Sequence, residues 1–199
     1  LSLDWGVFLS AVVSQNLQSK YKILNSFWEQ QPKIINDIID SFCDYYEFLE
    51  YKTLHLYYGH DGNARAHNRS DETYGDEVKR LLKARGWNVI DKSKHKPAAA
   101  HNTKYTLINL MFKGHSSRYP AIEINEHNNK DLIISLERAE AKDGKNGIAK
   151  VKKDESNASM KQQHTTHLSD AFDIPIFEIF KGKLKADQDN WDLSGIINK

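Results

Sequence analysis

The sequence predicts an α/β domain with a mixed sheet, in which three antiparallel strands are followed by parallel strands and flanking helices. Three strand-like segments, residues 1–5, 8–17 and 21–28, come first, and short polar connections join them, as is typical of antiparallel neighbours. Strand-like and helix-like segments then alternate, which indicates parallel pairing. A length of 199 residues is enough for one domain with a substantial core.

The middle of the chain supplies the alternating elements. Residues 34–49 carry apolar side chains at helical spacing, and Pro32 is expected to start this helix. Residues 53–58 are apolar on both faces, as a central strand requires. The remaining elements expected here are a helix over 74–85 closed by Gly86, a strand over 87–90, a helix over 102–112, a strand over 119–125 and a helix over 131–141.

The last third of the chain adds a hairpin and a helix. Residues 141–153 are expected to form an added β-hairpin that turns at Gly-Lys-Asn-Gly, because Asn-Gly favours such turns. Residues 162–180 form a helical region that we expect to be interrupted near Pro175. The polar tail, about 182–199, is expected to pack loosely. Residues 1–199 are therefore one domain, and we expect it to be a piece of a longer protein, since its opening segment already reads as a strand.

Composition narrows the setting in which the chain works. No apolar run is long enough to cross a bilayer, so we expect no membrane association. The single cysteine, Cys43, excludes an internal disulfide framework and fits a reducing cytoplasm. Cys43 falls on a predicted helix face, where packing in the core is a better interpretation than catalysis.

The net charge of +1 is unremarkable, but the lysines are clustered. Clusters of this kind suit a surface that meets phosphates, although they also occur on plain solvated loops. The lysines that we expect to contact a nucleic-acid backbone are Lys92, Lys94, Lys96, Lys104, Lys145, Lys150, Lys152 and Lys153.

Three aspartates, far apart in the sequence, are candidates for a metal site. Asp4 ends the first strand and Asp61 follows the fourth, so parallel pairing of these strands would bring the two together at the sheet edge where ligands usually bind. Asp170 lies in a helical segment beside the core-like Ala171 and Phe172. Each aspartate alone is also explained by a turn or by a helix dipole. Carboxylates that converge in this way suit Mg²⁺ or Mn²⁺.

Other polar residues extend or compete with this set. Asp173 shares a helix face with Asp170 and is either an accessory metal ligand or a solvated acid, and His167 either supports a ligand or is exposed. Asp91 and Glu123 are alternatives to Asp61 as the second acid. Asp61 is preferred because its strand neighbours the first, and Glu123 alternates with isoleucines as an outward-facing residue does.

Three segments, Leu-Ser-Leu-Asp-Trp-Gly, Leu-His-Leu-Tyr-Tyr-Gly-His-Asp-Gly-Asn and Thr-His-Leu-Ser-Asp-Ala-Phe-Asp, resemble motifs of one known family. Their order over residues 1 to about 180 is similar to that in the C-terminal nuclease domain of phage and prophage terminase large subunits. The resemblance implies an RNase H-like fold in which Asp4, Asp61 and Asp170 bind two Mg²⁺ or Mn²⁺ ions. It also implies a hairpin near DNA.

The implied activity is endonucleolytic cutting of double-stranded DNA during genome packaging in the bacterial cytoplasm. The resemblance further implies an upstream ATPase domain, a terminase small subunit and a portal as partners. No phosphate-binding G-x-x-x-x-G-K-[ST] loop occurs in these 199 residues, so the resemblance covers only the nuclease part. Two alternatives stay open: an RNase H-like transposase, integrase or resolvase, and a non-catalytic DNA-clamping module.

Overall fold

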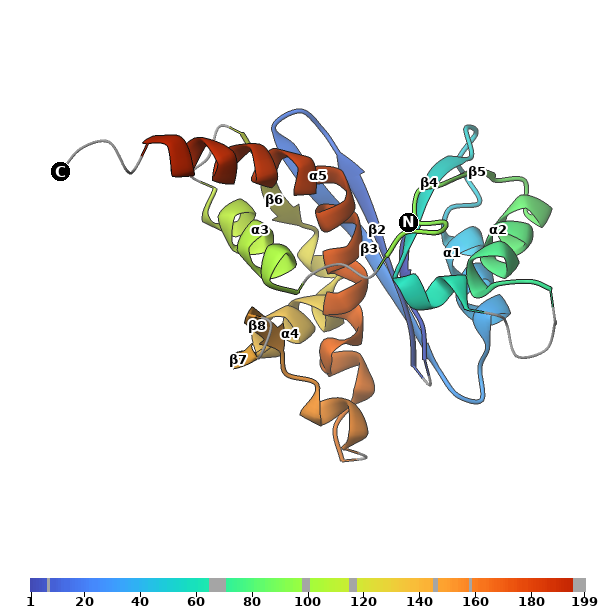
Figure 1. The fold of residues 1–199 in the computed structure, drawn as a ribbon. Helices are drawn as coiled ribbons and strands as arrows, with labels where there is room; N and C mark the ends of the chain where they lie inside the picture. The colour runs from blue at the N-terminus through green and yellow to red at the C-terminus, as the bar shows by residue number, and fades with distance from the viewer. Residues whose placement is uncertain are drawn as a thin grey trace.

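The computed structural model has an α/β fold with a six-stranded mixed sheet and five α-helices (Figure 1). It describes residues 1–6, 8–64, 71–97, 101–114, 118–144, 147–157 and 159–194, with side chains described up to residue 184. The sheet order is β5-β4-β1-β2-β3-β6, and β7 and β8 form a separate two-stranded sheet. The mixed sheet expected from the sequence is therefore confirmed.

The first three strands form the predicted antiparallel meander, and the later strands add in parallel. β4 pairs with β1, β5 pairs with β4, and β6 joins the other edge beside β3. The strands are β1 (Ser2–Asp4), β2 (Phe8–Asn16), β3 (Lys20–Gln30), β4 (Thr53–Tyr58), β5 (Asn88–Asp91) and β6 (Ala121–Ile124).

Helices cover both faces of this sheet. One core cluster joins the apolar faces of α1 and α2 to β1, β2 and β4, and a second joins α3, α4 and α5 to β2 and β3 (Figure 1). A central sheet needs this double cover, because apolar side chains leave both of its faces. The helices are α1 (Ile35–Tyr45), α2 (Tyr74–Ala84), α3 (His101–Lys113), α4 (Lys130–Arg138) and α5 (Thr166–Ser194).

Several local expectations are confirmed. Gly86 follows α2 with a φ of 83°, as a glycine that closes a helix does. Cys43 is a free, buried cysteine in the core of α1. The hairpin is present as β7 (Ala141–Gly144) and β8 (Gly147–Lys150), and its predicted turn residues 145 and 146 lie outside the described residues.

The prediction that Pro32 starts the first helix is wrong. Pro32 lies in a turn after a cis peptide bond, and α1 begins three residues later, at Ile35. The reason is a cap further along: the Asp37 carboxylate accepts the backbone N–H of Ile34 at 2.7 Å, which fixes the first turn at that point. The helix also ends at Tyr45 instead of residue 49.

The predicted interruption near Pro175 is also wrong, since α5 continues through Pro175 to Ser194. A proline has no N–H, so the carbonyl oxygen of Ala171, four residues earlier, loses its helical donor. The buried Ser2 hydroxyl of β1 donates to that oxygen at 2.6 Å and replaces the missing bond. The buried Leu184 packs in the core, and residues 195–199 of the expected loose tail lie outside the described part.

No described helix has an uncharged apolar stretch long enough to cross a bilayer.

Candidate functional site

The ends of β1 and β4 lie side by side. The two strands run parallel, with Ser2 opposite Tyr57 and Leu3 opposite Tyr58, so Asp4 at the end of β1 is level with Gly59 just after β4. The 3-10 turn η1 (His60–Asn63) follows at once and carries Asp61. This is the convergence of strand ends that the sequence predicted.

Two glycines allow η1 to fold tightly against the strand ends. A side chain at Gly62 would collide with the rings of Tyr58 and Trp5, and one at Gly59 would push the Asp61 carboxylate out of its position. The ring of Trp5 packs against that of Tyr58, with centroids 5.9 Å apart. The Gly-His-Asp-Gly segment therefore closes over an aromatic floor and holds Asp61 beside the end of β1.

Helix α5 brings the third aspartate to the same place. Two serines of the meander anchor this helix: Ser2 donates to Ala171 as described, and the Ser10 hydroxyl donates to the carbonyl oxygen of His167 at 3.0 Å. Because residues four apart share a helix face, Asp170, Ile174 and Glu178 point the same way. All three line the cavity at the ends of β1 and β4.

This acid cavity has a volume of about 320 Å³ and contains the three predicted aspartates Asp4, Asp61 and Asp170 in its wall. They come from β1, from η1 and from α5, and α5 begins more than a hundred residues after η1. The wall also includes the side chains of Lys96, His101, Lys104 and Lys152. The wall of this cavity therefore combines acidic and basic side chains.

The surroundings of Asp4 disfavour the negative charge of its carboxylate. Its side chain is 17% exposed, and its only hydrogen-bond partner among the described residues is His167, whose Nδ1 lies 3.4 Å from Oδ2. Burial, together with the negative charge of Asp170, raises the pKa of Asp4 from 3.8 to about 6, against the lowering effects of His167 and Lys152. The imidazole of His167 is itself held by stacking on Phe8, so the exposed alternative for this histidine is wrong.

The negative charge of Asp170, in contrast, is stabilised, because two lysines neutralise it. Lys150 Nζ lies 2.7 Å from Oδ1, and Lys152 Nζ lies 2.5 Å from Oδ2. Burial alone would raise the pKa of Asp170, but these two ammonium groups outweigh it and lower the pKa to about 2. The carboxylates in turn raise the pKa of Lys150, against the lowering effect of its burial. Asp170 is therefore charged and paired.

Asp173 faces a different cavity from the other three acids. Its carboxylate is buried and accepts from Lys150 Nζ at 2.7 Å, so the interpretation as a solvated acid is wrong. Burial raises its pKa, although Lys150 lowers it. Its side chain lines the neighbouring cavity between α3 and the hairpin, as Lys150 does, and it is not part of the acid cavity wall.

The competing second acids lie elsewhere. Asp91, at the end of β5, accepts from the Tyr58 hydroxyl at 3.0 Å and from the backbone N–H of Ser93, so it stabilises the loop after β5. Glu123 is exposed on the edge strand β6, where it pairs with Lys20 at 2.5 Å. Neither lines the acid cavity, whereas Asp61 does.

The lysines that were predicted to contact DNA have different surroundings in the structure. Lys150 and Lys152 are turned inward onto Asp170, which differs from the expected outward orientation, because buried carboxylates attract them. Three others form pairs with nearby acids: Lys94 with Asp76, Lys96 with Glu178, and Lys153 with Glu140. Lys104 lines the acid cavity, Lys92 lines a separate cavity, and Lys145 lies outside the described residues.

Sequence reasoning missed Glu178. Its side chain is only 7% exposed, it lines the acid cavity, and it pairs with Lys96 and with Lys181. The signal was its spacing of eight residues from Asp170, which places both on one face of a helix. The expected interruption at Pro175 concealed that spacing, because it placed the two residues on separate helical segments.

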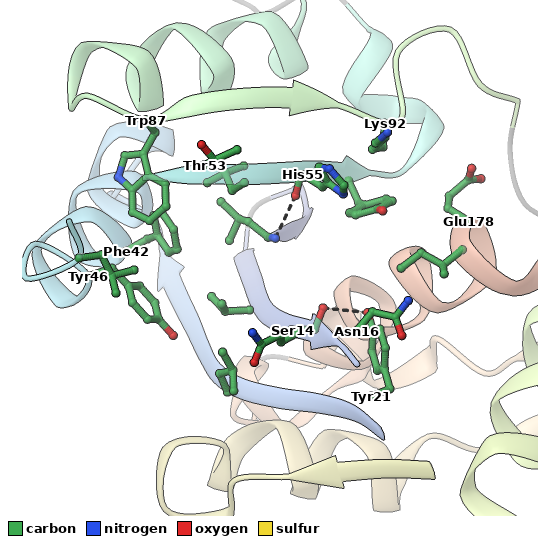
Figure 2. A pocket seen from close by; sticks show the side chains of 18 of the residues that line it. Ser14, Asn16, Tyr21, Phe42, Tyr46, Thr53, His55, Trp87, Lys92 and Glu178 are labelled. Atoms are coloured by element: carbon green, nitrogen blue, oxygen red, sulfur yellow. Dashed lines mark hydrogen bonds between the residues drawn. The ribbon is translucent and has the colours of Figure 1, made fainter. Parts of the chain in front are cut away.

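Another cavity, about 780 Å³ (Figure 2), lies away from the three predicted aspartates, although Lys96 and Glu178 line both this cavity and the acid cavity. Phe42, Tyr46 and Trp87 gather at one end of it, and Lys92 and Glu178 lie at the other. None of the three predicted aspartates lines it. Its wall is mainly apolar and offers no set of acids for metal chemistry.

Across the described residues, no three or more His, Cys, Asp or Glu side chains are grouped closely enough to hold a metal ion. The reason is visible in the pairs above: lysines hold Asp170, and Asp61 is exposed at the rim. Comparisons with protein-family models, with curated proteins and with solved structures found no match to this chain. Residue chemistry and geometry are therefore the support for a functional proposal.

Proposed function

We propose that this chain is an RNase H-like, metal-dependent endonuclease domain that cuts double-stranded DNA, of the type found in terminase large subunits. The observation that carries the proposal is the meeting of Asp4, Asp61 and Asp170 in the wall of one cavity. They arrive there from the first strand, from the turn after the fourth strand, and from the last helix. Scattered turn or surface acids would have no reason to converge.

The sheet topology supports the same proposal. Three antiparallel strands, a fourth strand parallel to the first, and a fifth strand parallel to the fourth are the arrangement expected of an RNase H-like fold. β6 and the hairpin β7–β8 are additions to that plan. By resemblance, cutting would serve genome packaging together with an upstream ATPase domain.

The carboxylate chemistry of these residues suits Mg²⁺ or Mn²⁺, but their side chains would have to move closer together to hold an ion, because the described residues form no such group as they stand. Asp4 is a largely buried carboxylate, and within the described part of the chain its one partner at salt-bridge distance is His167, at 3.4 Å. Hard divalent cations prefer such carboxylate oxygens, and Asp4, Asp61 and Asp170 would be the ligands. Two such ions, when bound, lower the pKa of an attacking water and stabilise the leaving oxygen of a phosphodiester.

The chain's own residues have separate tasks in this proposal. His167 holds the orientation of the Asp4 carboxylate through its contact with Oδ2. Lys104 and Lys96 present positive charge in the cavity wall, where a DNA phosphate would enter. Lys150 and Lys152 have to release Asp170 before this carboxylate can bind a cation, and the ammonium groups are then available to phosphate.

A plasmid-nicking assay with Mn²⁺ tests the proposal. We expect the wild-type protein to nick supercoiled plasmid, and Asp4→Asn, Asp61→Asn and Asp170→Asn each to lose this activity. Glu123→Gln is the matched control, because Glu123 is an acid on the far edge of the sheet and should be dispensable. Chelation with EDTA should stop nicking by the wild type. Full activity in all three aspartate variants would overturn the proposal.

A second candidate is a DNA-clamping module with a weak metal site, and the lysine pairs on Asp170 favour it. In that case Lys150 and Lys152 replace the cation permanently, and Asp170 has a structural task. Calorimetric titration with Mn²⁺ separates the two candidates. A nuclease should show binding that Asp4→Asn and Asp170→Asn remove, whereas a clamp should show DNA binding without any aspartate-dependent metal signal.

A further inference from the structure

A second cavity adjoins the acid cavity on the side of α3. It has a volume of about 410 Å³, within the range of small-ligand pockets, and lies between α3, the end of α4, the hairpin β7–β8 and α5. His101 and Lys104 line both cavities, so the two recesses share a wall. Helix α3 packs against both α5 and β8 (Figure 1), and Lys150 of β8, which lines this second cavity, is paired with Asp170 of the acid cavity.

The wall of the second cavity has two half-exposed aromatic rings. Tyr105 is 42% exposed and Phe112 is 48% exposed, although large aromatic side chains are usually buried. They are seven residues apart on α3, with Ile108 between them, so all three side chains share one helix face. The ring of Phe112 is held on its inner side by stacking on the buried Phe172, with centroids 5.9 Å apart.

One cation in the wall of this cavity, Lys104, is available to an anionic ligand. The two acids of the cavity are already paired, Asp173 with Lys150 at 2.7 Å and Glu140 with Lys153 at 3.4 Å. Lys104 has no ion-pair partner among the described residues, and it stands at the junction with the acid cavity. Exposed aromatic rings beside an unpaired cation are the combination that binds unpaired nucleotides, because each base stacks on a ring while the phosphate meets the cation.

We propose that the cavity formed by Tyr105, Ile108, Phe112 and Lys104 binds one or more unpaired bases of the DNA strand whose phosphate enters the acid cavity. This inference rests on the proposed function and deepens it, because it makes a locally opened duplex or a single-stranded end the preferred substrate. An intact duplex keeps its bases stacked inside the helix, so it can offer only its backbone to the same surface.

Direct binding tests this inference without requiring cleavage. Fluorescence anisotropy would be measured in EDTA with labelled oligothymidylate and, separately, with a blunt duplex of the same length. Tyr105→Leu and Phe112→Leu keep apolar volume but remove the stacking surface. We expect each to weaken oligothymidylate binding by about tenfold or more and to leave duplex binding nearly unchanged.

The matched controls are Tyr51→Leu and Phe48→Leu. These rings are 84% and 75% exposed and follow α1, on the opposite face of the sheet, so both variants should bind as the wild type does. Photo-crosslinking with an oligonucleotide that contains 5-iododeoxyuridine gives a spatial check, and the crosslink should map to the α3 peptide. Unchanged affinity in both α3 variants, equal losses for single strand and duplex, or a crosslink confined to other peptides would overturn the inference.

The two proposals can fail separately. If the wild type nicks plasmid but the α3 variants still bind oligothymidylate normally, only the proposal of a base-binding cavity is overturned. If oligothymidylate binds selectively and this binding depends on Tyr105, but no Mn²⁺-dependent nicking occurs, the nuclease proposal is overturned. The cavity is then a nucleic-acid binding site.

Discussion

Replacing Asp4 by Asn should stabilise the metal-free protein at neutral pH, even though it should abolish the proposed cleavage. Burial raises the pKa of the Asp4 carboxyl from 3.8 to about 6, so the folded protein carries at neutral pH a charge that its surroundings disfavour. At about 1.4 kcal/mol for each pKa unit, this difference corresponds to about 3 kcal/mol of stability. Asn has nearly the same shape and carries no charge.

The stability of the wild-type protein depends on pH through the Asp4 carboxyl. The folded state binds the Asp4 proton more tightly than the unfolded state, so the free energy of unfolding of the wild type falls as pH rises from about 4 to about 6. Urea unfolding in EDTA over this range should show that slope in the wild type and in Glu123→Gln, and a flatter curve in Asp4→Asn. An Asp4→Asn protein that is less stable than wild type at neutral pH, or that keeps the slope, would show that burial does not destabilise the Asp4 carboxylate.

Three further changes probe the contacts around the site. Lys150→Met should cost about 3 to 5 kcal/mol in urea unfolding, because it leaves two buried aspartates short of a cation, whereas Lys153→Met, at a 65% exposed side chain, should change stability little. Acid unfolding should reveal the lowered pKa of Asp170. Its ion pairs contribute about 2 kcal/mol to the free energy of unfolding above pH 4, and this contribution is lost as pH falls through about 2. In Asp170→Asn, the free energy of unfolding should therefore fall less steeply over this acidic range. Ser2→Ala should lower the free energy of unfolding by about 1 to 3 kcal/mol, because the Ala171 carbonyl loses its donor, and an unchanged melting temperature would contradict the account of Pro175.

The neighbouring ends of β1 and β4 could be predicted from the sequence because they depend on local patterns. The short connections of the meander fixed antiparallel pairing, and an apolar strand followed by Gly-His-Asp-Gly placed Asp61 at a strand end. Parallel pairing of β1 with β4 then brings Asp4 and Asp61 to the same edge. These steps need only the period of the side chains and the direction of the strands.

Apart from the local cap that moved the start of α1 past Pro32, the errors came from contacts between distant residues. The rule that proline interrupts a helix is local, and it was overridden at Pro175 by the hydroxyl of Ser2, which is more than 160 residues away. The lysine cluster of the hairpin gave no sign of its partners, so Lys150 and Lys152 were expected to face outward although they pair with Asp170. The second cavity was invisible for the same reason, because four separate elements contribute to its wall.

The most direct measurement for the central claim is anomalous diffraction from a crystal of this protein soaked in Mn²⁺. We expect manganese peaks coordinated by the carboxylates of Asp4, Asp61 and Asp170, with the ammonium groups of Lys150 and Lys152 moved off Asp170. Manganese bound only elsewhere, with both lysines still paired to Asp170 at saturating Mn²⁺, would contradict it.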